Sequence, residues 1–117
     1  MPSWKLTVRH GSDVEQLGFD DLGDAVAAMR QRAMEIRAAG RAAPVSALRD
    51  FEPGDQVQAR LQLRGKGWLR KPVGGIDVRG DGTFAPYRGG VRREELDPSG
   101  HKTPFELVRE TLERATP

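Results

Sequence analysis

The sequence of 117 residues contains no cysteine, which excludes disulfides, thiol catalysis and every cysteine-ligated metal site. Its two histidines, His10 and His101, have no third ligand nearby in the sequence, so no metal or other cofactor is expected. No apolar run approaches the length of about 18 residues that a membrane-spanning helix needs. The first residues lack the apolar core of a signal peptide. These absences predict a cytoplasmic protein that does not insert into a membrane.

The sequence also lacks a recognisable catalytic constellation. Ser12 and His10 fall in one expected loop, but nothing places a carboxylate behind the histidine or builds an oxyanion hole. The acidic residues Asp20, Asp21 and Asp24 precede or open an expected helix, where carboxylates are favoured without any catalytic role. We therefore expect a protein that acts by binding, with an enzyme as the most distant reading.

Hydrophobic periodicity predicts the elements of the first third of the chain. Residues 4–9 alternate strictly, which places Trp4, Leu6 and Val8 on one face of a strand. A hairpin loop at 10–13 and a returning strand at 15–19 follow. A helix should then begin after Asp20 or Asp21 and end at Gly40, a residue suited to a helix C-terminus. Its apolar stripe is formed by Leu22, Val26, Met29, Ala33 and Ile36.

The rest of the chain returns to the period of strands before a final helix. Strands are expected at 45–51 and 56–64, separated by a turn at 52–55, and a hairpin is expected at 76–88 around Asp81-Gly82. Thr103 as N-cap, Pro104 and Glu106 form a capping box for the last helix. Its apolar stripe comprises Phe105, Val108 and Leu112.

These elements predict an α+β fold with the order β-β-α-β-β-β-β-α, in which two helices pack on a mainly antiparallel sheet. We expect residues 1–117 to form a single domain. A ββα unit at 1–43 followed by a strand-rich unit at 44–117 is the alternative, although each would be small for a core of its own.

The net charge of +2 conceals a segregation of charge along the chain. Residues 1–55 carry a balance of −2 and residues 94–117 a balance of −3. Residues 56–93, in contrast, carry nine basic residues against Asp77 and Asp81, a balance of +7. Trp68, Phe84 and Tyr87 lie among these cations, and such a combination is typical of a surface that contacts phosphates and stacks on bases.

The candidate binding residues are eight of the nine cations of this segment, all except Arg79, together with Trp68. They are Arg60, Arg64, Lys66, Trp68, Arg70, Lys71, Arg88, Arg92 and Arg93. RNA or DNA is the leading partner. The alternative is a protein partner or an accessory role, in which Trp68 and a sheet edge form the interface, since arginine is equally normal at protein interfaces. Trp68 could serve as a stacking platform or fold onto the core.

Three short motifs in this segment have simpler explanations than their known functional counterparts. Arg79-Gly80-Asp81 matches a cell-adhesion tripeptide but lies in the expected hairpin turn. Arg88-Gly89-Gly90 is a single copy of a motif that acts as a repeat in disordered chains. Gly65-Lys66-Gly67 is too short for a phosphate-binding loop and does not open a helix.

Three stretches of sequence carry a family resemblance. They are residues 3–11 (SWKLTVRHG), residues 18–22 (GFDDL) and residues 51–55 (FEPGD). In this pattern the chain resembles short uncharacterised proteins from actinobacterial genomes over nearly its whole length. The resemblance implies a bacterial cytoplasmic protein and no catalytic residue. The hairpin followed by a capped helix also looks like the start of several small nucleic-acid-binding α+β domains, although a shared fold does not fix function.

Overall fold

The structure, a computed structural model, describes residues 3–41, 57–66, 71–90, 92–100 and 103–115. The strands are β1 (Trp4–His10), β2 (Asp13–Phe19), β3 (Val57–Gly65), β4 (Val73–Arg79), β5 (Phe84–Arg88) and β6 (Glu94–Glu95). The helices are α1 (Leu22–Arg41) and α2 (Pro104–Ala115). The predicted α+β class and the order β-β-α-β-β-β-β-α are confirmed.

The four strands that follow α1 differ in part from the four that were predicted after the first helix. The strand expected at 45–51 and the turn at 52–55 lie outside the described residues. The short strand β6 was not predicted, because two consecutive glutamates carry no strand periodicity. β4 also begins three residues earlier than expected, because Gly74 and Gly75 have no side chains whose alternation could indicate a strand.

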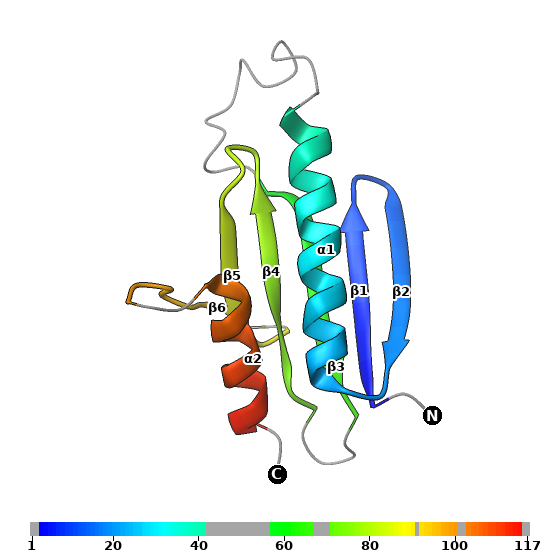
Figure 1. Ribbon diagram of the computed structural model, residues 1–117, viewed down its shortest axis with the longest axis vertical. Coiled ribbons are helices and arrows are strands. Elements are labelled where there is room, and N and C mark those ends of the chain that lie inside the picture. The colour runs from blue at the N-terminus through cyan, green and yellow to red at the C-terminus, as the bar shows by residue number, and fades with distance from the viewer. Residues whose placement is uncertain (1–2, 42–56, 67–70, 91, 101–102, 116–117) are drawn as a thin grey trace.

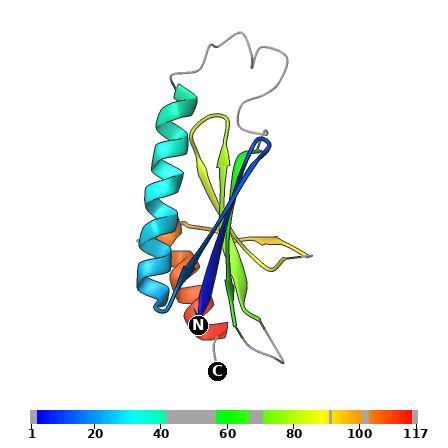
Figure 2. The ribbon, with the colours of Figure 1, turned by 90° about the vertical axis from the view of Figure 1, so that its right-hand side faces the viewer.

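All six strands form one antiparallel sheet in the order β2-β1-β3-β4-β5-β6. Both helices lie on the same face of this sheet: α1 packs mainly on β1, β3 and β2, and α2 packs on β5 and β4 (Figures 1 and 2). The arrangement has two layers, helices over a sheet. Among the described residues, no helix or strand packs on the other face.

The core lies between these two layers. The alternation predicted for the first strand is confirmed, since Trp4, Leu6 and Val8 are buried. Leu6 and Val8 pair in register with Leu63 and Leu61 of β3. The predicted helical stripes supply most of the opposing surface, and their buried residues are Val26, Met29, Ala33, Ile36, Phe105, Val108 and Leu112.

The predicted helix starts are confirmed by their capping contacts. The backbone N–H of Asp24 donates to Oδ2 of Asp21 at 3.3 Å, so Asp21 is the N-cap of α1. The N–H of Glu106 donates to Oγ1 of Thr103 at 3.1 Å, as a capping box requires. The expected end of α1 at Gly40 is wrong, because the helix includes Gly40 without a positive φ and reaches Arg41.

Gly40 allows α1 and Gln58 to approach each other closely and does not form a turn. A Cβ atom at this position would come within 2.7 Å of the side chain of Gln58, so the missing side chain lets α1 and that residue approach. Turn geometry does require glycine at Gly82, which has a φ of +87° in the hairpin between β4 and β5. There the N–H of Thr83 donates to Oδ1 of Asp81 at 2.9 Å. This contact confirms that Arg79-Gly80-Asp81 leads into a hairpin turn.

Candidate anion-binding face

The face of the sheet that points away from the helices is called the open face here. Side chains alternate along a strand, so the neighbours of the buried residues Leu6, Leu61 and Ile76 point to it. Both helices lie on the opposite side of the sheet (Figure 2). The polar residues that the register assigns to the open face are Lys5, Thr7, Arg9, Gln16, Arg60, Gln62, Arg64, Asp77, Arg79, Tyr87 and Glu95.

Two pairs of like charges stand directly opposite each other on this face. Lys5 of β1 is in register with Arg64 of β3, and Arg9 is in register with Arg60. The Cβ atoms of directly opposite residues lie about 5 Å apart, and like charges at that distance destabilise a sheet. No ion pair between described residues involves Lys5, Arg9 or Arg64. The pair formed by Lys5 and Arg64 is therefore uncompensated within the described part of the chain.

The pair formed by Arg9 and Arg60 is compensated on one side only. Arg60 makes a bidentate contact with Asp77 of β4, from Nε to Oδ1 at 2.8 Å and from Nη2 to Oδ2 at 3.1 Å. This hydrogen bonding raises the pKa of Arg60 above its usual value and fixes the plane of its guanidinium group. Arg93 approaches the same carboxylate at 3.7 Å. One largely buried carboxylate thus holds two guanidinium groups at the surface of the open face.

Tyr87 is buried in the sheet beneath these arginines. Its side chain is only 3% exposed, and its hydroxyl donates a hydrogen bond to the carbonyl oxygen of Leu61 at 3.2 Å. The guanidinium carbon of Arg93 lies 5.3 Å from the centroid of the tyrosine ring. Burial, and next the negative charge of Asp77, raise the pKa of the Tyr87 hydroxyl well above its ordinary value. The buried ring of Tyr87 therefore packs directly beneath the guanidinium group of Arg93.

This placement corrects the expectation that Phe84 and Tyr87 supply rings for base stacking. Tyr87 is covered, and Phe84 points to the helix side, where it packs edge-to-face on Phe105 with centroids 5.2 Å apart. The guanidinium of Arg37 covers Phe84 at 4.4 Å. Neither ring is open to a base.

Replacing Tyr87 by phenylalanine should reduce the loss of stability that the protein shows when pH rises into the alkaline range. The pKa of Tyr87 is higher in the folded than in the unfolded chain. The neutral hydroxyl therefore contributes its full stabilisation below the unfolded pKa of about 10, and this stabilisation is lost as pH rises through the folded pKa. Urea unfolding at about pH 7 and about pH 11 should show a smaller loss for Tyr87→Phe than for the native chain. At neutral pH the variant should be less stable by about 1 kcal/mol, because the bond to Leu61 is gone.

Tyr87 is the only tyrosine in the chain, so the absorbance of phenolate reports this residue alone. The native protein should show no phenolate at the pH where free tyrosine ionises. Phenolate should appear only as the chain unfolds. Ionisation near pH 10 in the folded protein would contradict the buried placement.

Three further predicted residues, from segments that precede or follow strands of the sheet, are exposed. Lys66 follows β3, is exposed, and lines a shallow hollow together with Lys5 and Gln16. Lys71 precedes β4 and is exposed, as is Arg92 between β5 and β6. Trp68 and Arg70 lie outside the described residues.

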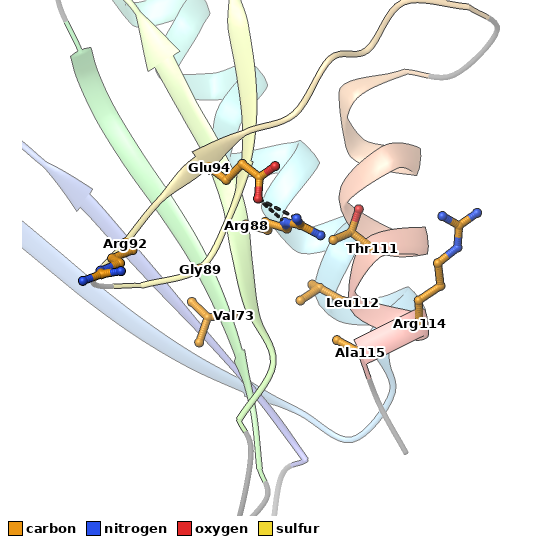
Figure 3. Close-up of a pocket in the computed structure, with 9 residues that line it drawn as sticks. All are labelled: Val73, Arg88, Gly89, Arg92, Glu94, Thr111, Leu112, Arg114 and Ala115. Atoms are coloured by element: carbon orange, nitrogen blue, oxygen red, sulfur yellow. Dashed lines mark hydrogen bonds and ion pairs between the residues drawn. The ribbon is translucent and has the colours of Figure 1, made fainter.

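Arg88 lies on the other side of the sheet from this group. It is in register with Gly74, whose Cα faces Leu112 of α2 on the helix side. Its Nε donates to Oε2 of Glu94 at 2.7 Å, at the rim of a cavity of about 430 Å³ beside the end of α2 (Figure 3). The side chain of Arg92 projects away from Arg88 and from the helix in the same view. Among the described residues, Arg88 therefore does not share a face with Arg60 and Arg64.

Sequence reasoning missed Lys5 and Arg9, which lie in a segment whose net charge is negative. The alternation of the first strand was the signal that could have found them, since it turns both side chains to the same face. Their neighbours on β3 could not be identified from the sequence, because Lys5 and Arg9 pair with residues more than fifty positions away.

Across the described residues, no group of three or more His, Asp or Glu side chains is arranged to hold a metal ion. Neither described helix is long and apolar enough to cross a membrane. No family model, curated protein or solved structure matches this chain. The geometry of the open face is therefore the basis for proposing a function.

Proposed function

We propose that the protein binds the sugar-phosphate backbone of RNA or DNA through its open face, without catalysing a reaction. The observation that carries this proposal is the pair Lys5 and Arg64, two exposed cations that stand directly opposite each other and that no carboxylate of the described residues pairs with. A sheet does not gain stability from such an arrangement. A bound phosphate would remove the repulsion and gain two charge-assisted contacts.

The spacing of the cations favours an extended polyanion. Lys5 and Arg9 are four residues apart on β1, and Arg64 and Arg60 are four apart on β3, so the two cationic pairs lie about 14 Å from each other. Between them the register places Thr7 opposite Gln62, which offer hydrogen-bonding groups without charge. This pattern, in which cations flank neutral polar groups, suits a chain of phosphates and sugars that runs along β1 and β3.

The absence of open rings on the described part of this face favours contacts to phosphate over contacts to bases. Phosphate contacts position a nucleic acid but carry no sequence information. We therefore expect little preference for base sequence. Strong dependence on salt is expected, because each neutralised phosphate releases a counterion.

The test is a titration of fluorescently labelled single-stranded RNA and duplex DNA at about 50 and about 200 mM salt. Three to four phosphate contacts predict a loss of affinity between the two conditions of roughly 40- to 150-fold for duplex DNA and roughly 20- to 50-fold for single-stranded RNA. Arg64→Ala should weaken binding and reduce the slope of log K against log salt by about 1. Arg30→Ala is the matched control, since Arg30 is an exposed cation on α1, on the helix side of the sheet.

No binding at the lower salt concentration would overturn the proposal, as would equal effects of Arg64→Ala and Arg30→Ala. Retention of a stoichiometric protein partner after nuclease treatment, combined with absent nucleic-acid binding, would favour the protein-interaction alternative. An accompanying loss of that partner in Arg64→Ala would place its interface on the open face.

A further inference from the structure

The strand β2 forms one margin of the sheet, and no described element pairs with its outer side (Figure 1). It is seven residues long and pairs with β1 without a register shift. The opposite margin is different, because β6 has only two residues. Proteins usually protect a long edge strand with proline, lysine or a bulge. Residues 13–19 of β2 contain no proline, lysine or arginine, and their ladder contains no bulge. Glu15, a charge that β2 directs to the helix side, is neutralised by Arg32 at 2.8 Å.

The hydrogen-bond pattern shows which main-chain groups of β2 point outward. β1 and β2 are joined by a loop of two residues, so His10 and Asp13 form the first hydrogen-bonded pair. Hydrogen bonding then alternates along the strand, so the N–H and C=O groups of Asp13 and of every second residue after it bond to β1. The N–H of Lys66 donates to the carbonyl of Ser3 at 2.9 Å, which confirms that the odd-numbered residues of β1 bond to β3 instead. The outward N–H and C=O groups of β2 therefore belong to Val14, Gln16 and Gly18.

This edge is complementary to itself. If a second copy of the strand runs antiparallel with Gln16 opposite Gln16, Val14 stands opposite Gly18 on both sides of the two-fold axis. All three outward residues of each copy are then paired through their main chains. Val14 is 54% exposed, and in this register its side chain covers the space left by the absent side chain of Gly18. No other register of two copies pairs all three outward residues with one another.

We propose that two copies of this chain associate through β2, forming one continuous antiparallel sheet around a two-fold axis at Gln16. The association does not depend on the proposed function. It has a consequence for that function, because the open faces of the two copies then lie side by side on one sheet. The cationic pairs of both copies would contact the same polyanion, which raises affinity through multivalency. Strand pairing without a large apolar interface predicts weak association, roughly micromolar or weaker.

Cysteine trapping tests this register, since the native chain contains no cysteine that could compete. Residues opposite each other in a hydrogen-bonded pair have Cα atoms about 5.5 Å apart, within the range that a disulfide spans. Gln16→Cys should therefore form a disulfide-linked dimer under mild oxidation. Val14→Cys is the matched control, because the two Val14 positions would lie about 14 Å apart across the axis, beyond disulfide reach. Both side chains are exposed, so neither substitution disturbs the core.

We expect Gln16→Cys to cross-link at least about tenfold faster than Val14→Cys at equal protein concentration. Equal rates, or no cross-linked dimer, would overturn the proposal. Sedimentation provides a second measurement. Gln16→Pro removes the central outward N–H without breaking the ladder to β1 and should abolish concentration-dependent dimers, whereas Gln16→Ala should retain them. These experiments contain no nucleic acid, so their failure would leave the binding proposal for a single copy untouched.

Discussion

Replacing Gly75 by alanine is expected to destabilise the fold by about 3 kcal/mol or more, a large share of the roughly 5 to 15 kcal/mol by which an ordinary domain is stable. Gly75 lies on the open face of β4, in register with Gln62 of β3. A Cβ atom there would stand far inside the van der Waals distance of the carbonyl oxygen of Leu61 and 2.8 Å from the hydroxyl of Tyr87. Leu61 contributes main chain, which cannot rotate away, so β3 and β4 would have to separate.

The neighbouring glycines provide graded controls. At Gly90 an added Cβ would make only ordinary contacts, at 3.7 and 3.8 Å, so Gly90→Ala should change the free energy of unfolding by no more than about 0.5 kcal/mol. At Gly74 the nearest atom would be the carbonyl oxygen of Tyr87 at 3.1 Å, and Gly74→Ala should have an intermediate effect. Urea unfolding followed by circular dichroism measures all three. A similar effect at the three positions would contradict the close approach of the Leu61 carbonyl and the Tyr87 hydroxyl to Gly75.

Local patterns in the sequence were sufficient to predict most of the fold. The caps at Asp21 and Thr103 and the inward face of β1 depend on neighbours within a few residues, and all are confirmed. Gly40 was misjudged because glycine is common both at helix ends and at close approaches between elements. Only the position of Gln58, a side chain from another part of the chain, separates the two cases.

The candidate site depends on pairing between distant strands, which periodicity does not contain. The alternation of β3 turns Arg60 and Arg64 to one side of their strand, but their partners Lys5 and Arg9 come from the first ten residues. Arg88 alternates with Tyr87, so the two could not share a face once β5 was in register. The burial of Tyr87 follows from Arg93, which the chain between β5 and β6 places above the ring.

Replacing Lys5 by glutamate is expected to raise stability while it weakens binding to nucleic acid. The substitution converts a repulsive cross-strand pair with Arg64 into an attractive one, which should add about 0.5 to 1 kcal/mol to the free energy of unfolding. It also replaces a cation on the proposed phosphate path by an anion, so affinity at low salt should fall by at least about tenfold, equivalent to 1.4 kcal/mol. A side chain that serves the fold alone would not show these opposite effects.

A double-mutant cycle separates the pair from the rest of the face. Arg64→Glu should behave as Lys5→Glu does, whereas the double variant restores repulsion between like charges and should lose the gain in stability. The stability gain of each single variant should shrink at high salt, because both side chains are exposed and their charges are screened. Single variants less stable than the native chain would mean that another group already compensates Lys5 and Arg64. Unchanged affinity of both single variants for nucleic acid would show that Lys5 and Arg64 are not part of the binding surface.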